Sequence, residues 1–242
     1  MNHNSEERFF WCRKVQLFSW LRLSLQILDK SHFEPFGKMC FQNNEYLCRK
    51  IVNQKRMLNL DNFYKARYVL SKIIRRTDLV HAPKINPESD VYLKPECLQK
   101  TGSFKIRGAY YKISQLSEEE KKKGVIACSA GNHAQGVALG ATSMGIKSLI
   151  CLPEGAPISK VEATKKLGAE VCLVPGVYDD AYQKALQLRD EHGYTFIHPF
   201  DDENVIAGQG TIGLELLDQL PDVEAVVVPV GGGGLISGVA YA

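Results

Sequence analysis

The sequence predicts an α/β protein built from open parallel sheets with helices on both faces. After residue 57, segments rich in Val, Ile, Leu and Cys alternate with segments whose apolar residues recur at helical spacing. The strand-like segments, of which residues 224–228 are typical, are apolar throughout. Parallel strands covered on both faces require such runs, and repeated strand–helix–strand units predict a doubly wound arrangement.

Composition argues against several other classes of protein. The 242 residues carry 30 basic and 27 acidic side chains, and this net charge of +3 is too small to suggest a nucleic-acid partner. The longest apolar stretch, residues 15–28, is interrupted by Gln16, Arg22 and Gln26, so we expect no membrane span. The seven cysteines include no C-x-x-C pair, which predicts free thiols and a reducing, cytoplasmic location. We expect the last three, in apolar runs, to be buried.

The first 56 residues differ from the rest of the chain. They hold 10 Lys/Arg and 5 Asp/Glu, together with both tryptophans and six of the ten phenylalanines. Their apolar residues fit a strand and a helix equally well, so no fold is predicted for them. We interpret residues 1–56 as an unassigned N-terminal extension and Met57 as a candidate start of the functional protein; the alternative is an ordinary accessory segment.

The remaining elements follow in chain order. A helix with apolar positions Phe63, Ala66 and Leu70 begins after Asp61, which we expect to cap it. A strand at 91–93 and a helix at 103–116 precede a short charged helix, Glu118–Lys123, which begins with a capping box. Alternating elements complete the chain: strands at 124–128, 147–152, 170–174, 194–198 and 223–230, and helices at 133–144, 158–167, 178–191 and 210–219.

Lys105 is the first candidate for a chemical role. It lies in the segment Lys100–Ala109 and falls in the first turn of a predicted helix. The positive end of a helix disfavours a cation, so we expect this amine to be neutral more often than that of an ordinary lysine. A neutral amine is the form that condenses with a carbonyl group. The alternative is a surface lysine with no chemical role.

The turn from Ser129 to Gly136 is the second candidate, because it directly follows the strand at 124–128 and opens a helix. Backbone N–H groups at a helix start can bind an anion such as a substrate carboxylate. Asn132 adds a side-chain amide for a ring oxygen or hydroxyl. The alternative is an ordinary helix cap in which His133 has a structural role.

The third candidate is the run Gly231–Gly234 with Leu235, after the strand at 223–230. Four consecutive glycines lose much entropy on ordering and offer no side chains for packing. A backbone nest around a phosphate group explains such a run, and a flexible loop is the alternative.

Two further patterns are set aside. Residues 208–213 match the dinucleotide motif G-x-G-x-x-G, but residues 201–204 before them do not form a strand, and no acidic residue ends the next strand. Residues 140–148 resemble a P-loop only loosely. Three histidines are spread without metal-ligand spacing, and two acidic pairs read as caps or loop charges. These are His81, His192, His198, Asp179-Asp180 and Asp201-Asp202.

The three candidate segments together suggest pyridoxal phosphate. This cofactor needs an amine for its aldehyde, a cradle for its phosphate and a polar partner for its ring oxygen. On Thr101–Ala109, Ser129–Gln135 and Gly231–Leu235, in this order and spacing, the chain from Met57 onward resembles the fold-type II pyridoxal-phosphate enzymes. Within them it is most similar to the threonine dehydratase (threonine ammonia-lyase) family. Residues 1–56 carry no part of this resemblance.

The resemblance implies a role for each matched residue. Lys105 would bind the cofactor aldehyde as a Schiff base and, once freed, remove the substrate α-proton. The other cofactor contacts would come from Phe104, Asn132, Gly231, Gly232, Gly233, Gly234 and Leu235. The substrate carboxylate would be held by Ser129, Gly131, Asn132 and His133.

The activity implied is β-elimination of L-threonine, and of L-serine, to a 2-oxo acid and ammonia by a homo-oligomer. Serine racemase and cysteine synthase share the fold. The racemase relatives have a serine where this chain has Ala130, whose methyl group cannot relay a proton, so the dehydratase is favoured. Alternatives from other classes are an inactive fragment or interaction module based on the N-terminal extension, and a nucleotide-binding protein.

The resemblance also implies the domain organisation, which is like that of the tryptophan synthase β-subunit. Residues 57–125 and 204–242 would form the larger cofactor domain, and residues 126–203 the smaller α/β domain. The larger domain is expected to be incomplete, because the family's remaining strands and its partner for the pyridine nitrogen would lie beyond Ala242. Cys97 stands where the family often has asparagine, which would weaken any bracing of the lysine loop.

Overall fold

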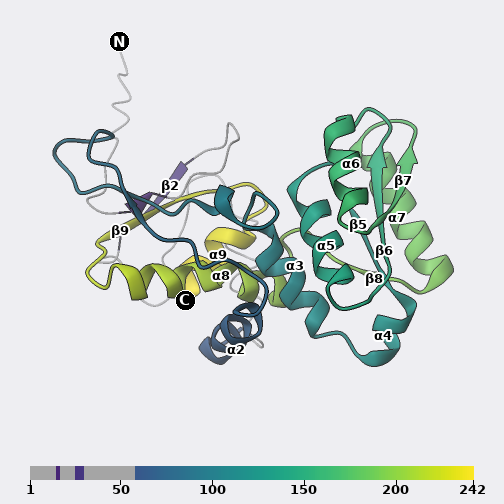
Figure 1. The fold of residues 1–242 in the computed structure, drawn as a ribbon, viewed down its shortest axis with the longest axis horizontal. Helices are drawn as coiled ribbons and strands as arrows, with labels where there is room; N and C mark the ends of the chain where they lie inside the picture. The colour runs from purple at the N-terminus through teal and green to yellow at the C-terminus, as the bar shows by residue number, and fades with distance from the viewer. Residues whose placement is uncertain (1–14, 17–24, 30–57) are drawn as a thin grey trace, which may run out of the picture.

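The computed structural model describes residues 15–16, 25–29 and 58–242, which form two sheets with associated helices (Figure 1). The strands are β1 Val15–Gln16, β2 Leu25–Asp29, β3 Val80–His81, β4 Tyr92–Leu93, β5 Val125–Cys128, β6 Ser148–Pro153, β7 Glu170–Val174, β8 Thr195–Phe196 and β9 Ala225–Pro229. The larger sheet has the order β2-β9-β1-β4-β3, and the smaller sheet the order β7-β6-β5-β8.

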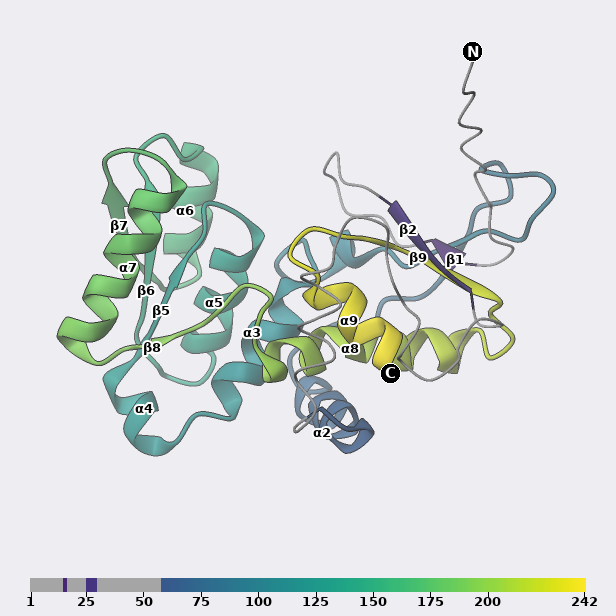
Figure 2. The same cartoon turned by 180° about the vertical axis from the view of Figure 1, so that it is seen from behind.

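Most of the described helices fall between these strands, as the α/β class requires. They are α2 Leu60–Leu70, α3 Lys105–Ser114, α4 Glu118–Lys123, α5 Asn132–Thr142, α6 Ile158–Lys166, α7 Tyr178–His192, α8 Glu203–Gln219 and α9 Gly234–Tyr241, with a 3₁₀ turn, η2, at Glu96–Leu98. Helix α3 lies between the two sheets in both views of the ribbon (Figures 1 and 2).

The smaller sheet is parallel throughout and covered on both faces. Alternate residues of β5 show this directly. Val125 and Ala127 belong to a core shared with α3, α5 and α6, whereas Ile126 and Cys128 pack with α7 on the other face. Successive side chains of a strand point to opposite faces, so a strand covered on both sides is apolar at every position. This observation confirms the predicted fold class.

The larger sheet contains both parallel and antiparallel pairs. Strand β1 is parallel to β4 and β9, whereas β3 and β2 pair antiparallel at the two edges. An antiparallel edge strand on an otherwise parallel sheet is common in large α/β folds. Strands β1 and β2 come from residues 1–56, for which no fold was predicted. Apart from these two strands, residues 1–56 lie outside the described residues, so the hypothesis that they form an extension stays a prediction.

Glycines in α8 allow close helix packing, which explains the G-x-G-x-x-G pattern. A Cβ atom at Gly208 would lie 2.5 Å from the carbonyl oxygen of Arg107 in α3. A Cβ atom at Gly210 would lie 2.2 Å from the Phe63 ring of α2 and 2.6 Å from the carbonyl oxygen of Gly238 in α9. Real side chains do not fit at such distances, so this pattern serves packing inside a helix.

Two predicted helix starts are wrong. Helix α2 is capped by Asn59, whose side chain accepts from the Asn62 N–H, and Asp61 lies inside the first turn. Helix α8 starts at Glu203 instead of residue 210, because Asp202 Oδ1 accepts from the N–H groups of Asn204 and Val205. The glycines of α8 misled the prediction, since glycine weakens helices that lack tertiary packing.

The described cysteines are all free. Cys128 and Cys151 are buried as expected, whereas Cys172 is only half-buried and Cys97 is exposed. Burial raises the pKa of the Cys128 thiol to about 11, which is typical of an inert core cysteine. Among the described residues, no helix has the length and hydrophobicity of a membrane span.

The predicted domain boundaries remain predictions. Ala109 and Ile113 of α3, which the prediction assigned to the larger domain, pack in the core beneath the smaller sheet.

Candidate active site

A cavity of about 370 Å³ brings the three candidate segments together. It lies where β9 ends and where α3, α5 and α9 begin, a usual place for ligands in an α/β fold. Its wall contains every residue predicted to contact the cofactor: Phe104, Lys105, Asn132, Gly231, Gly232, Gly233, Gly234 and Leu235. The predicted carboxylate-binding residues Ser129, Gly131 and His133 are not part of this wall.

Lys105 starts helix α3 and presents its amine to the cavity wall. Its Nζ donates a hydrogen bond to the carbonyl oxygen of Pro199 at 2.6 Å and lies 5.2 Å from the centroid of the Phe104 ring. Burial lowers the pKa of the Lys105 amine to about 8. The predicted direction was therefore right, but the cause is loss of water around the amine, whereas the prediction invoked the helix terminus.

The glycine loop forms another part of the wall. Helix α9 starts at Gly234, and its N-cap Gly233 has a φ of 84°, in the left-handed region that favours glycine. A Cβ atom at Gly232 would lie 2.3 Å from the Phe200 ring. The loop therefore needs glycine, and it opens a helix whose first N–H groups can bind an anion. An amine and an anion-binding loop in one cavity fit pyridoxal phosphate.

The turn after β5 leads into the cavity at Asn132. Gly131 is the N-cap of α5 and has no side-chain hydrogen bond in that role, while its own N–H donates to Ser129 Oγ at 3.2 Å. Asn132 is exposed, lines the cavity and accepts a hydrogen bond from Lys160 Nζ at 3.5 Å. The start of α5 therefore lacks a side-chain cap, as a carboxylate site at this turn requires.

The contacts of the His133 side chain do not support a role in carboxylate binding. Its ring is buried, and Nε2 lies 2.8 Å from the carbonyl oxygen of Ile197. Burial, reinforced by the nearby Lys105 amine, lowers the pKa of His133 to about 3, so the imidazole is neutral and donates from Nε2. Only its backbone N–H is placed to assist the turn, which supports the structural alternative for this side chain.

Residues after β8 were missed by sequence reasoning. Phe200 lines the cavity and packs against the glycine loop, and the Pro199 carbonyl holds the Lys105 amine. His198 had been noted only as a histidine without metal-ligand spacing. The signal was available, because residues 198–200 follow a predicted parallel strand and thus lie at the same sheet edge as the turn after β5.

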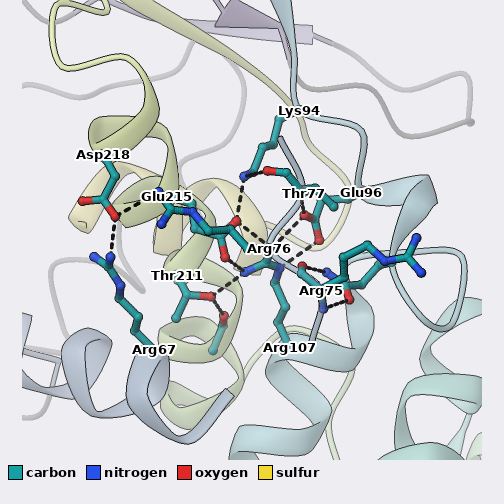
Figure 3. Close-up of polar contacts among 12 residues, drawn as sticks. Arg67, Arg75, Arg76, Thr77, Lys94, Glu96, Arg107, Thr211, Glu215 and Asp218 are labelled. Atoms are coloured by element: carbon teal, nitrogen blue, oxygen red, sulfur yellow. Dashed lines mark hydrogen bonds and ion pairs between the residues drawn. The ribbon is translucent and has the colours of Figure 1, made fainter. Parts of the chain in front are cut away.

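A buried network of charges lies beside the cavity (Figure 3). Arg107 donates to both oxygens of Glu96, each at 2.8 Å, and to Glu215 at 2.7 and 3.0 Å. Lys94 donates to Glu215 at 2.6 Å. Burial would raise the pKa of Glu215, but hydrogen bonds from Arg107 hold it below its ordinary value. Two cations and two carboxylates thus balance and join η2, α3 and α8 around the cavity.

The fold, together with a cavity lined by a lysine and a glycine loop, defines an α/β protein suited to bind a phosphorylated aldehyde. Residues 70–242 match the family model described as pyridoxal-phosphate dependent enzyme. The chain therefore belongs to this family, which confirms the family and the cofactor predicted from sequence.

Curated relatives include L-threonine ammonia-lyase of Thermotoga maritima, 55% identical over 77% of this chain and 47% of the relative. The catabolic L-threonine dehydratase TdcB of Escherichia coli K12 is 47% identical over 76% of this chain and 56% of the relative. The chain thus spans about half the length of the curated relatives it matches.

Similar solved structures include both threonine deaminases and serine racemases. The processed form of threonine deaminase isoform 2 from Solanum lycopersicum has a TM-score of 0.68 and 40% identity, covering 76% of this chain and 53% of that one. Maize serine racemase has a TM-score of 0.71 and 37% identity, covering 76% of this chain and 56% of that one.

Proposed function

We propose that the protein containing this chain is a pyridoxal-phosphate-dependent ammonia-lyase that acts on L-threonine and, as a second substrate, on L-serine. The observation that carries the proposal is the single cavity that holds the Lys105 amine and the loop Gly231–Gly234. The relatives named for L-threonine ammonia-lyase and L-threonine dehydratase support the substrate.

The residues divide between cofactor and substrate. We propose that Lys105, Phe104, Asn132 and the loop with Leu235 hold the cofactor. The loop N–H groups would bind its phosphate, and the Asn132 amide would bind its ring oxygen. Ser129, Gly131, Asn132 and the backbone of His133 would hold the substrate carboxylate at the start of α5.

Lys105 performs the proton transfer in this proposal. The bound cofactor supplies an electron sink that makes the substrate α-proton acidic. Lys105 Nζ then removes that proton, and its pKa of about 8 suits a general base near neutral pH. Loss of the β-hydroxyl as water and hydrolysis of the released product, which takes up one water, convert threonine to 2-oxobutanoate and ammonia. Serine gives pyruvate and ammonia.

Serine racemase is the second candidate, because racemase structures are among the similar folds. Racemisation needs a second proton-transfer group on the opposite face of the substrate. The residue after Ser129 is Ala130, and a methyl group cannot carry a proton. The elimination proposal therefore predicts that Ala130→Ser raises D-serine formation from L-serine in a coupled assay. Unchanged D-serine formation would remove this argument against the racemase.

Binding of the cofactor tests the proposed function most directly. Added pyridoxal phosphate should give an absorption band at roughly 410–420 nm, the usual signature of its Schiff base with a lysine. Lys105→Ala should abolish the band. A band of full height in this variant, or none in the wild type, would contradict the proposal.

Location, partners and assembly complete the proposal. A small amino-acid substrate, no nucleic-acid or membrane partner, a cytoplasmic location and a homo-oligomer are proposed from composition and from the family resemblance. Residues 1–56 supply β1 and β2, which pair with β4 and β9 in the larger sheet, so deleting them tests the stability of that sheet as well as any function of the segment.

A further inference from the structure

A short segment between β8 and α8 touches all three candidate motifs. We call residues 197–201 the linking segment. The Ile197 carbonyl lies 2.8 Å from His133 Nε2, and the Pro199 carbonyl accepts from Lys105 Nζ at 2.6 Å. The Phe200 ring packs on the glycine loop at Gly232. The shape of this one segment therefore affects the positions of the amine, the start of α5 and the glycine loop together.

The imidazole of His198 fixes this shape from within. Its Nδ1 accepts hydrogen bonds from the N–H of Asp201 at 2.7 Å and from the N–H of Phe200 at 3.3 Å. A ring nitrogen that accepts carries no proton, so this interaction requires the neutral imidazole with its hydrogen on Nε2. The ring also lies edge-on to Phe200, with centroids 4.7 Å apart.

The two hydrogen bonds meet on a single peptide group. The carbonyl of Pro199 and the N–H of Phe200 belong to the same planar unit, and in a trans peptide they point in opposite directions. Lys105 Nζ binds the oxygen on one side, and His198 Nδ1 binds the N–H on the other. Hydrogen bonds joined in a chain polarise and strengthen one another, so the orientation of this peptide depends on both ends.

We propose that His198 is a positioning residue for Lys105, because its Nδ1 fixes the peptide group whose oxygen holds the Lys105 amine at the cavity wall. This inference rests on the proposed function, since that function makes Lys105 the reacting amine. A lysine side chain without a hydrogen-bond partner explores many rotamers. Holding it in one rotamer before the cofactor arrives is worth about tenfold in the rate at which its amine reacts with a bound aldehyde.

A matched pair of substitutions separates the acceptor atom from the bulk of the ring. His198→Asn places an oxygen at the same number of bonds from the backbone as Nδ1, where it can accept from the same two N–H groups. His198→Leu has the same branched shape without an acceptor. Both variants lack the imidazole ring that contacts Phe196 and Phe200.

The test is the rate at which the absorption band forms when pyridoxal phosphate is added to the cofactor-free chain. We expect His198→Asn to remain within about threefold of the wild type and His198→Leu to be about tenfold slower. Circular dichroism and the thermal midpoint check that both variants fold. Equal rates in the two variants, whether fast or slow, would overturn the inference.

Two controls keep the outcomes separate. If His198→Leu does not fold, His198→Gln replaces it as the test variant, because the longer glutamine side chain carries its acceptor one bond farther from the backbone. Formation of the absorption band at the wild-type rate in His198→Gln would overturn the inference. A wild-type chain that forms no band, or a band that survives in Lys105→Ala, would overturn the proposed function itself. Band formation that depends on Lys105 but not on the acceptor at 198 would overturn only the role of His198.

Discussion

Lys94 and Lys105 lie on the wall of the same cavity but in different surroundings. Burial lowers the pKa of both amines. Lys94 donates to Glu215, to the Thr77 carbonyl and to Gln219, so its charge is matched and its donors are used. Lys105 has the neutral Pro199 carbonyl as its acceptor. We propose that this difference in partners separates the two roles, with Lys94 structural and Lys105 reactive.

The comparison also explains why a charge network lies beside the cavity. Arg107 is two residues from Lys105 in α3, and its fully buried guanidinium binds Glu96 and Glu215 (Figure 3). These ion pairs fix α3 against η2 and α8 on one side of the helix. The start of the same helix then presents Lys105 to the cavity. Rigid support of this kind keeps a reacting group within the small tolerance that catalysis allows.

The largest effect is expected at Arg107. Replacing it in Arg107→Met leaves two buried carboxylates with one cation, and breaking such a buried network costs about 3–5 kcal/mol of unfolding free energy. Arg67→Met is the matched control, because its partner Asp218 is a third exposed and a surface pair is worth about 1 kcal/mol or less. Urea unfolding measures both variants. Equal losses would show that the buried network is no stronger than the surface pair.

The two lysines themselves should respond in opposite ways. Lys94→Met leaves Glu215 with Arg107 but without its second cation, and should cost about 1–3 kcal/mol of unfolding free energy while the cofactor band still forms. Lys105→Met should change the unfolding free energy by less than about 1 kcal/mol, since one hydrogen bond to a carbonyl is lost and an apolar side chain replaces a buried amine. It should abolish the band.

This contrast is read from one urea titration and one absorption spectrum for each variant. A Lys94→Met protein that folds but forms no absorption band would contradict the assignment of Lys105 as the reacting amine. A loss of several kcal/mol in Lys105→Met would make Lys105 a structural residue.

Local patterns predicted the smaller sheet and the three cavity motifs, because each lies in a few consecutive residues. The apolar strands, the strand-to-helix turns and the glycine run are all readable without tertiary information. The pairing of Arg107 with Glu215 was not predicted, since the two residues are far apart in the sequence and only packing of α3 on α8 brings them together.

Other features depend on burial, which sequence does not give directly. The pKa of Lys105 is lowered by desolvation, and the neutral state of His133 follows from its place beneath the turn. The start of α8 was misplaced because its glycines pack against α3 and α9, and a helix with such contacts tolerates residues that weaken an isolated one.

The glycine loop provides a third test of the cavity. Gly232→Ala places a Cβ atom 2.3 Å from the Phe200 ring, so either the ring or the loop must move. We expect the affinity for pyridoxal phosphate to fall about tenfold, because the loop N–H groups no longer converge on one phosphate. Gly155→Ala is the control, since no atom lies within 4 Å of its Cβ position and it is absent from the cavity wall. Equal affinities would show that the loop does not grip the phosphate.

The smallest effect is the pH dependence of the two amines, measured by brief acetylation and mass spectrometry of the cofactor-free chain. Only the neutral amine reacts, so reactivity rises with pH until the pKa is passed. With a pKa of about 8, Lys105 should react about tenfold faster at pH 9 than at pH 7 and then level off. Free Nα-acetyl-lysine, with a pKa near 10.4, should rise about 100-fold over the same range and continue. Lys94 should remain unlabelled, because its donors are bound within the protein. A Lys105 profile parallel to that of the free amino acid would show that burial does not tune this amine.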